Sequence, residues 1–433
     1  MTENIDAAAL AAREQAALAR YQAGDLSGAA DAFRALLTLS PEHPTALEFL
    51  GFEASQRADY AAAVDYYRRA SSAVPTDASH VFNLAMGHYG LNDLPAALAA
   101  LEQTLERDPR LIEAQLYRGT VLERMQRPAD AALAFLRAVR FAEANLDPQQ
   151  MPPDLKRYLN HALGVVRAHL DAEIDRSLAD LVAAHGADAV SRLRKAGDIF
   201  VGKRPPDFAH PKWRPGLMYV PDLPPKAFYE RADFDWVSRV EAATEIVRAE
   251  LMNVMTEGRG FAPYVNHPEG TREAQIWKSI NQSYDWSTFH FYRHGERIEE
   301  NCARCPGTAA LLESIDIMRV PGYGPEAMFS VLKPHSRIPP HYGTVNGRLI
   351  VHLPLIVPEN CGALKAAGEA RGWEEGKLMI FDDSFEHEAW NDSDQTRVVL
   401  IFDTWNPNLD PVERQAFSRV LETAQSYERA ALG

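Results

Sequence analysis

Two histidines and an arginine near the C-terminal end have the residue types and spacing of a metal and carboxylate site. His341 lies in PPHYG, His387 lies 46 residues later in DDSFEHEAW, and Arg397 follows ten residues after the second histidine. A neutral imidazole suits Fe(II), and a guanidinium fork suits a dicarboxylate ligand. Taken alone, the pattern also fits two histidines with purely structural roles.

The acidic residues around His387 are poor candidates for a third metal ligand. In an extended strand, Glu386 and Glu388 point away from the face that His387 uses. Asp382 and Asp383 stand where a strand-like segment meets a turn, and acids commonly cap such turns. We therefore interpret this pair as turn caps.

The three cysteines give no sign of a second site. Cys302 and Cys305 form a lone CxxC motif before Pro306, and a thiol at a helix N-terminus can have a lowered pKa. A structural zinc needs four ligands, however, and no second pair exists. With Cys361 as the third cysteine, we expect free thiols in a reducing compartment.

The elements that must position His341, His387 and Arg397 are short β-rich runs separated by Pro, Gly and Asn-Asp turns. The clearest runs cover residues 328–334, 348–357, 377–383 and 397–405, preceded by one or two helices over about 235–255. This spacing favours an antiparallel sandwich or jelly roll over βαβ units.

The first half of the chain contains a repeat of 34 residues. Prolines, alanines and large residues recur in one register, as Pro41, Pro75 and Pro109; Ala29, Ala63, Ala97 and Ala131; and Phe33, Tyr67, Leu101 and Phe135. Small residues let two helices approach closely, and the large residue fills the adjoining groove. Leu50-Gly51 and Gly119 fit the same register, which resembles the tetratricopeptide (TPR) family and its pairs of antiparallel helices.

The 34-residue phase stops near Pro152, and two amphipathic helices are expected over about 154–172 and 177–200, where they would cap the solenoid. Residues 203–226 contain seven prolines and predict a linker. The resulting domains are residues 1–150 (TPR repeats), 151–203 (capping helices and the start of the linker) and 204–433 (the β-rich domain).

Composition excludes several classes of protein. The net charge of −15 disfavours general binding to nucleic acid. The chain begins without an apolar leader core, and no stretch approaches the roughly 18 apolar residues of a membrane span. These features predict a folded cytoplasmic protein.

Four sequence blocks in the C-terminal half resemble the aspartyl/asparaginyl β-hydroxylases. They are HYGTVNGR (341–348), LIVHL (349–353), WEEGKLMIFDDSFEHEAW (373–390) and FDTWNP (402–407), within a similarity that spans roughly residues 205–420. The resemblance implies an α+β chain in which an all-α TPR solenoid precedes a double-stranded β-helix (jelly-roll) oxygenase domain. It also implies Fe(II), O2 and 2-oxoglutarate as the requirements for hydroxylation of the β-carbon of Asp or Asn.

The same resemblance assigns roles to individual residues. His341 and His387 would bind iron, with Gly343 where many related oxygenases carry a carboxylate. The cosubstrate would be held by Arg397 and Ser330 at its distal carboxylate and by His352 at its iron-proximal end, with Trp286 walling the pocket and Arg348 near the substrate carboxylate. Vertebrate members have a second arginine where this chain has Ile350, so the contact to the C1 carboxylate differs here.

Three functions are compatible with this sequence. The first is β-hydroxylation of Asp or Asn in a peptide or protein recruited by the TPR groove. The second is hydroxylation of a lipid acyl chain, as in relatives that modify lipid A, which predicts a membrane anchor or an exposed apolar face. The third is a non-catalytic TPR scaffold, which the joint presence of His341, His387 and Arg397 disfavours.

Overall fold

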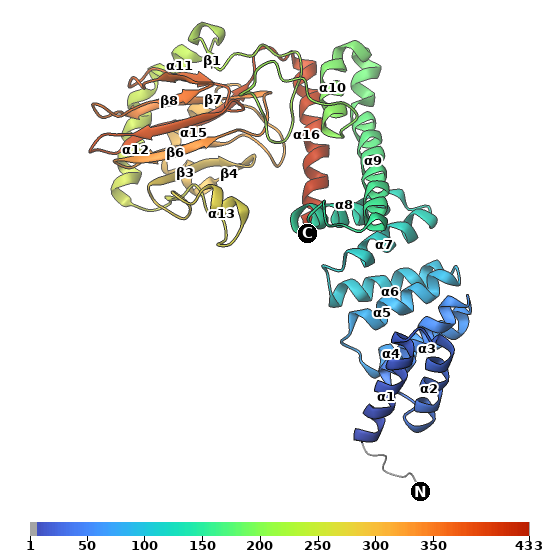
Figure 1. Cartoon of the computed structure of the whole chain (residues 1–433). Helices are drawn as coiled ribbons and strands as arrows, with labels where there is room; N and C mark the ends of the chain where they lie inside the picture. Colours follow the sequence, from blue (N-terminus) through green and yellow to red (C-terminus); the bar gives the residue numbers. More distant parts are fainter. Residues whose placement is uncertain (1–6, 433) are drawn as a thin grey trace. The chain divides into compact units, whose positions relative to one another are not determined.

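A computed structural model describes residues 7–432. The chain forms two compact units, one of residues up to 169 with those from 427 onward, the other of residues 170–426 (Figure 1). None of the described helices is long and apolar enough to cross a membrane.

The first unit contains helix pairs that follow the 34-residue phase. The pairs are α1 (Ala7–Gln22) and α2 (Leu26–Leu39), α3 (Pro44–Gln56) and α4 (Tyr60–Ala73), α5 (Ala78–Gly90) and α6 (Leu94–Arg107), and α7 (Ile112–Arg124) and α8 (Pro128–Asn145). This confirms the predicted helical repeats.

Aspartates with the same 34-residue spacing start the second helices. Asp25, Asp59 and Asp93 are the N-caps of α2, α4 and α6, and each carboxylate accepts a main-chain N–H three residues later. Such a cap satisfies a donor that has no partner inside the helix. Pairing of the helices depends on small residues: a Cβ added at Gly51 would lie 2.6 Å from the Tyr67 ring.

The two predicted capping helices are partly wrong. A single helix, α9 (Pro153–His185), covers residues 154–172 and continues through the expected break, followed by η1 (Ala187–Val190) and α10 (Ser191–Phe200). Residues 171–176 contain no Gly or Pro to stop a helix. In its first part, Tyr158 packs against Tyr117 of α7, with ring centroids 6.2 Å apart, as a cap of the last repeat would.

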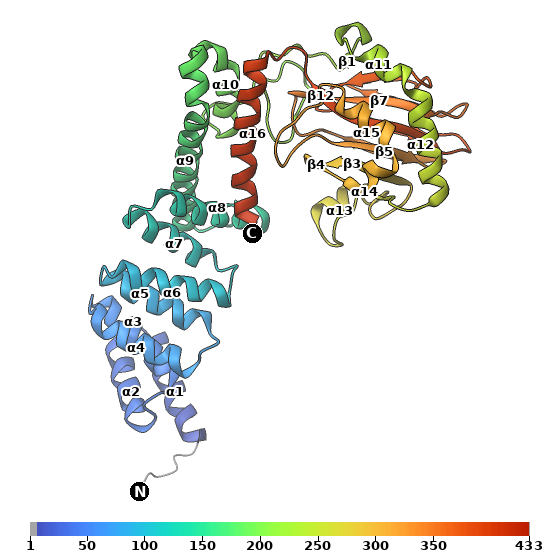
Figure 2. The ribbon, with the colours of Figure 1, turned by 180° about the vertical axis from the view of Figure 1, so that it is seen from behind.

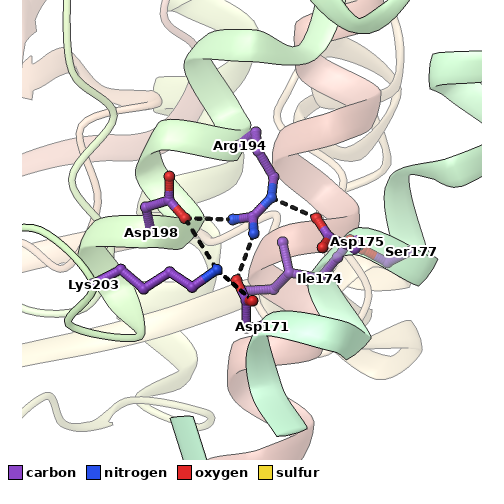
Figure 3. A network of polar contacts seen from close by, with 7 residues as sticks. All are labelled: Asp171, Ile174, Asp175, Ser177, Arg194, Asp198 and Lys203. Atoms are coloured by element: carbon purple, nitrogen blue, oxygen red, sulfur yellow. Dashed lines mark hydrogen bonds and ion pairs between the residues drawn. The ribbon is translucent and has the colours of Figure 1, made fainter. Parts of the chain in front are cut away.

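An ion-pair network fixes the later part of α9 to α10 within the second unit (Figure 3). Arg194 of α10 contacts Asp171 and Asp175 of α9, both at 2.5 Å, and Asp198 at 2.9 Å. Lys203 also reaches Asp171. These acids explain why a polar stretch of sequence remains helical.

The proline-rich segment 203–226 differs from a free linker because it packs on the β-rich domain. Trp213 is fully buried and stacks on Phe385, with centroids 5.2 Å apart. Its Nε1 donates to Asp382 Oδ2 at 3.1 Å and to Ser384 Oγ at 2.8 Å. Prolines keep the segment extended, while the large side chains between them supply the packing.

Two antiparallel sheets form the centre of the second unit. The larger sheet has the order β1 (Phe228–Tyr229), β10 (Met379–Phe381), β7 (Arg348–Ile356), β12 (Arg397–Trp405), β5 (Ala327–Leu332), β3 (Trp286–Arg293) and β2 (Ala262–Pro263), with β4 (Glu296–Arg297) beside β3. The smaller sheet has the order β6 (Ser336–His341), β11 (His387–Asn391), β8 (Leu364–Ala366) and β9 (Glu369–Arg371). From β5 to β12 the chain crosses repeatedly between the sheets, which is the connectivity of a jelly roll.

Apolar cores lie on both faces of the larger sheet. One contains Leu332, Ile338, Leu364 and Val399 from both sheets, and so lies between them. The other is covered by α11 (Val237–Ala242), α12 (Thr244–Glu257), α14 (Glu299–Arg304) and α15 (Pro306–Glu313), as Figure 2 shows. The remaining elements are η2 (Arg231–Asp233), α13 (Arg272–Ile276) and α16 (Pro411–Leu432).

Candidate active site

His341 and His387 are direct neighbours on the smaller sheet. They are paired residues at the adjoining ends of β6 and β11, and their ring centroids are 3.9 Å apart. His341 Nδ1 lies 2.8 Å from Pro339 O, and His387 Nδ1 lies 3.0 Å from Phe385 O. A carbonyl oxygen only accepts, so each Nδ1 carries the proton and each Nε2 presents a lone pair.

The electrostatic surroundings keep both imidazoles neutral. Burial, with the neighbouring imidazole as the next cause, lowers the pKa of His341 to about 3. Burial also lowers the pKa of His387 to about 4. Neutral imidazoles whose second nitrogens bind main-chain carbonyls have the form that metal-binding histidines take, so this pair fits a divalent metal.

The described residues offer no group of three or more His, Cys, Asp and Glu side chains that could hold a metal. Glu386 and Glu388 point outward, as predicted, and bind Lys212 and Lys365. At Gly343, an added Cβ would lie 2.3 Å from the Asp383 carboxylate carbon. The space beside Gly343 is thus occupied by an acid that arrives from another part of the chain.

The seven residues assigned from the sequence surround one cavity of about 110 Å³ between the sheets. They are Trp286, Ser330, His341, Arg348, His352, His387 and Arg397. Apolar side chains complete the lining, among them Ile338, Ile350 and Leu364. The seven residues come from six strands, β3, β5, β6, β7, β11 and β12, and meet at one place.

Arg397 is a buried cation among the residues that line this cavity. Its side chain is 1% exposed, and its Nε and one terminal nitrogen are buried without a hydrogen-bond partner. Among the described ion pairs, none joins Arg397 to a carboxylate. Burial lowers the pKa of Arg397 to about 10. An unpaired buried guanidinium is costly, so the cavity is suited to a ligand that brings a carboxylate.

Two further residues present hydrogen-bond donors to the cavity. Trp286 Nε1 donates to Ser330 Oγ at 3.0 Å, which leaves the hydroxyl hydrogen of Ser330 available. Trp373 Nε1 donates to His352 Nδ1 at 3.1 Å, so His352 carries its proton on Nε2. Burial, followed by the charge of Arg397, keeps the pKa of His352 well below its ordinary value.

Trp373 is a functional residue that the sequence interpretation missed. Besides fixing the tautomer of His352, its ring lies under the Arg397 guanidinium at 4.6 Å. It therefore positions two cavity residues at once. The available signal was its place at the start of the longest matching block, ahead of Glu374-Glu375-Gly376.

Arg348 is already engaged with acids. Its Nη2 lies 3.0 Å from Asp383 Oδ2, and its Nη1 lies 3.7 Å from Asp403 Oδ2. Asp382 caps its turn as predicted, by accepting from Ser384 N at 2.9 Å. The same interpretation is wrong for Asp383, which turns into the cavity because Arg348 attracts it there. Ile350, two residues from Arg348 on β7, contributes no charge.

The cysteines behave as structural residues. Cys302, Cys305 and Cys361 are free and buried. Cys305 precedes α15, yet burial raises its pKa to about 12. Burial also raises the pKa of Cys302 and of Cys361, so the protonated form of all three thiols is favoured.

Two family models match this chain. Residues 241–407 match the model described as Aspartyl/asparaginyl beta-hydroxylase, and residues 14–78 and 82–148 match Tetratricopeptide repeat. Over residues 241–407, the chain is thus similar to the aspartyl/asparaginyl beta-hydroxylases. All seven cavity residues lie within the matched hydroxylase region.

Relatives of the hydroxylase domain differ in their named activities. The Aspartyl/asparaginyl beta-hydroxylase of Mus musculus is 26% identical over 356 residues, which are 80% of this chain and 42% of that protein. The Ornithine lipid ester-linked acyl 2-hydroxylase of Rhizobium tropici is 36% identical over 185 residues, 42% of this chain and 62% of that protein. The chain thus spans about two-fifths of the length of the mouse relative.

Among solved structures, MamA 41-end from Desulfovibrio magneticus RS-1 is similar with a TM-score of 0.30 and 22% identity. The similarity covers 31% of this chain and 77% of that one.

Proposed function

We propose that this protein is an Fe(II)- and 2-oxoglutarate-dependent dioxygenase that hydroxylates the β-carbon of an Asp or Asn residue in a peptide or protein. The observation that carries the proposal is Arg397, a buried cation without a carboxylate partner, in the same cavity as two neutral imidazoles. A dicarboxylate that also chelates a metal meets both requirements.

The chain's own residues divide the work of binding. The Nε2 atoms of His341 and His387 would hold the metal, which supplies activation of O2 when it is bound. Arg397 would bind the distal carboxylate of 2-oxoglutarate, and the Ser330 hydroxyl would donate to it. His352 Nε2–H would donate to the proximal carboxylate, and Trp286 would close one wall against water.

The TPR repeats would recruit the substrate. Paired-helix repeats commonly bind extended peptides, and a second binding surface raises the local concentration of substrate at the catalytic cavity. This role accounts for a repeat unit on an enzyme that already has a complete set of cavity residues.

Hydroxylation of a lipid acyl chain is the second candidate. It is favoured by the 36% identity to the ornithine lipid acyl 2-hydroxylase and by the apolar cavity residues Ile338, Ile350 and Leu364. A scaffold without catalysis is the weaker alternative, because an unused Arg397 would cost stability for no return.

The experiment that tests the proposal is removal of one metal ligand. His387→Ala leaves one imidazole, so we expect loss of bound Fe(II) and of succinate formation from 2-oxoglutarate, measured by metal analysis and product assay. His185→Ala, at the end of α9, is the control and should retain both. Undiminished metal content and turnover in His387→Ala would reject the proposal.

A further inference from the structure

A group of carboxylates lies at one border of the catalytic cavity. A second cavity of about 470 Å³ shares Tyr264, Glu326 and Arg348 with the inner one. A side chain that reaches the two imidazoles from this outer cavity therefore passes Glu326 and Arg348. Any substrate side chain that takes this route meets the charges at this passage.

The cation at the passage, Arg348, is already neutralised. Asp383 and Asp403 lie 3.0 and 3.7 Å from its terminal nitrogens, and Glu326 N donates to the same Asp403 oxygen at 3.1 Å. Burial raises the pKa of Asp403 to about 7 and also raises that of Glu326. Arg348 thus already faces two carboxyl groups, whereas Glu326 lies 3.2 Å from His294 Nδ1 and Arg293 lines only the outer cavity.

At the passage, two buried carboxylate oxygens without a hydrogen-bond partner face one unpartnered guanidinium donor, Arg348 Nε. The Oδ1 atoms of Asp383 and Asp403 are buried without a partner among the described residues. A substrate carboxylate would add two acceptors and a negative charge, whereas a primary amide brings two N–H donors and no charge. Ile350, beside the passage, supplies no additional cation.

We infer that the cavity is selective for an amide side chain, so that the hydroxylated residue is asparagine rather than aspartate. The inference rests on the proposed function and adds the chemical class of the reacting side chain. Arg348, Asp383, Asp403 and Ile350 together determine this specificity. Arg397 takes no part in it, because the cosubstrate carboxylate uses that residue.

The test uses the full chain with Fe(II) and 2-oxoglutarate and two peptide pools. The pools have identical randomised flanks, free of Asn and Asp, around a fixed central Asn or Asp. Hydroxylation is measured by mass spectrometry as addition of one oxygen atom, and we expect kcat/KM to be at least about tenfold higher for the Asn pool. Equal rates or a preference for Asp would overturn the inference and leave the proposed function standing. Hydroxylation of neither pool would instead overturn the proposed function, and this inference with it.

Two variants test the charge argument itself. Ile350→Arg adds a cation, and Asp403→Asn removes a carboxylate with little change in shape. Each should lower the Asn-to-Asp ratio about tenfold, while Ile350→Leu, which keeps size and charge, should preserve the ratio. An unchanged ratio in both charge variants would overturn the electrostatic explanation.

Discussion

Replacement of Arg397 by methionine separates the stability cost of a buried cation from its contribution to cosubstrate binding. Burial lowers the pKa of Arg397 from 12.5 to about 10, so the folded state disfavours the charged form. At about 1.4 kcal/mol per pKa unit, this corresponds to roughly 3 kcal/mol. The contact with the Trp373 ring, at 4.6 Å, returns on the order of 1 to 2 kcal/mol. We therefore expect Arg397→Met to be more stable than wild type by about 1 to 2 kcal/mol without cosubstrate.

The order should reverse when 2-oxoglutarate is present. A ligand at one hundred times its Kd stabilises the folded protein by about 2.7 kcal/mol. Loss of a charge-assisted bond worth about 2 to 3 kcal/mol raises Kd by roughly 30-fold to 150-fold. Wild type should thus gain stability from 2-oxoglutarate, and Arg397→Met should gain almost none. A basic group whose pKa is lowered in the folded state destabilises the fold at every pH below that folded pKa. The full stability difference between wild type and Arg397→Met is therefore expected at neutral pH.

Tryptophan fluorescence is a suitable assay because all seven tryptophans lie within residues 170–426. Denaturant unfolding would be followed with Zn(II) as a redox-inert metal, with and without 2-oxoglutarate, beside the KM for 2-oxoglutarate in succinate formation with iron. Arg337→Met is the matched control: Arg337 also lies over a tryptophan, at 5.3 Å, but is exposed and paired with Asp392. A destabilised Arg397→Met without ligand, or a KM within twofold of wild type, would refute the reasoning.

Three further predictions concern the cavity, the proposed recruitment of substrate by the first unit, and the packing of the repeat helices. Trp373→Phe keeps a ring beneath the guanidinium but removes the donor to His352, so the KM for 2-oxoglutarate should rise roughly fivefold, at about 1 kcal/mol per hydrogen bond; a change below twofold in the succinate assay would contradict this. A chain that starts at Leu170 retains the second unit but lacks the TPR repeats. Its KM for a protein substrate should rise, while its turnover of 2-oxoglutarate without substrate should stay similar. An unchanged kcat/KM on the protein substrate would exclude recruitment by the repeats. Gly51→Ala should destabilise the repeats by about 1 to 3 kcal/mol, because the added Cβ would lie 2.6 Å from the Tyr67 ring. Gly164→Ala is the control, since no neighbouring atom lies within 4 Å of its added Cβ. Thermal unfolding followed by far-UV circular dichroism compares the two variants, and equal melting temperatures would show that the close approach at Gly51 is unimportant.

The repeats and most strands could be predicted because their signals are local. The 34-residue repeat predicts which residues face each other in successive helix pairs. Buried strands are visible in the sequence as apolar runs between turn residues. Residue type and strand position made His341, His387 and Arg397 candidates, but their roles were assigned by the resemblance to the β-hydroxylases. The break expected near residue 175 is absent because Arg194, on the following helix, binds Asp171 and Asp175 of that stretch.

The sequence by itself determined the two kinds of architecture and the absence of a charge at Ile350, and its resemblance to the β-hydroxylases named seven of the residues that meet at the cavity. The tertiary structure decided what those residues do to one another. Asp383 could equally have capped its turn, like Asp382, and it faces the cavity only because folding brings Arg348 within 3.0 Å. Trp373 looks like an ordinary core aromatic until the fold places Arg397 against its ring and His352 against its Nε1. Burial and ion pairing depend on all neighbours in space, and no pattern along the chain encodes them.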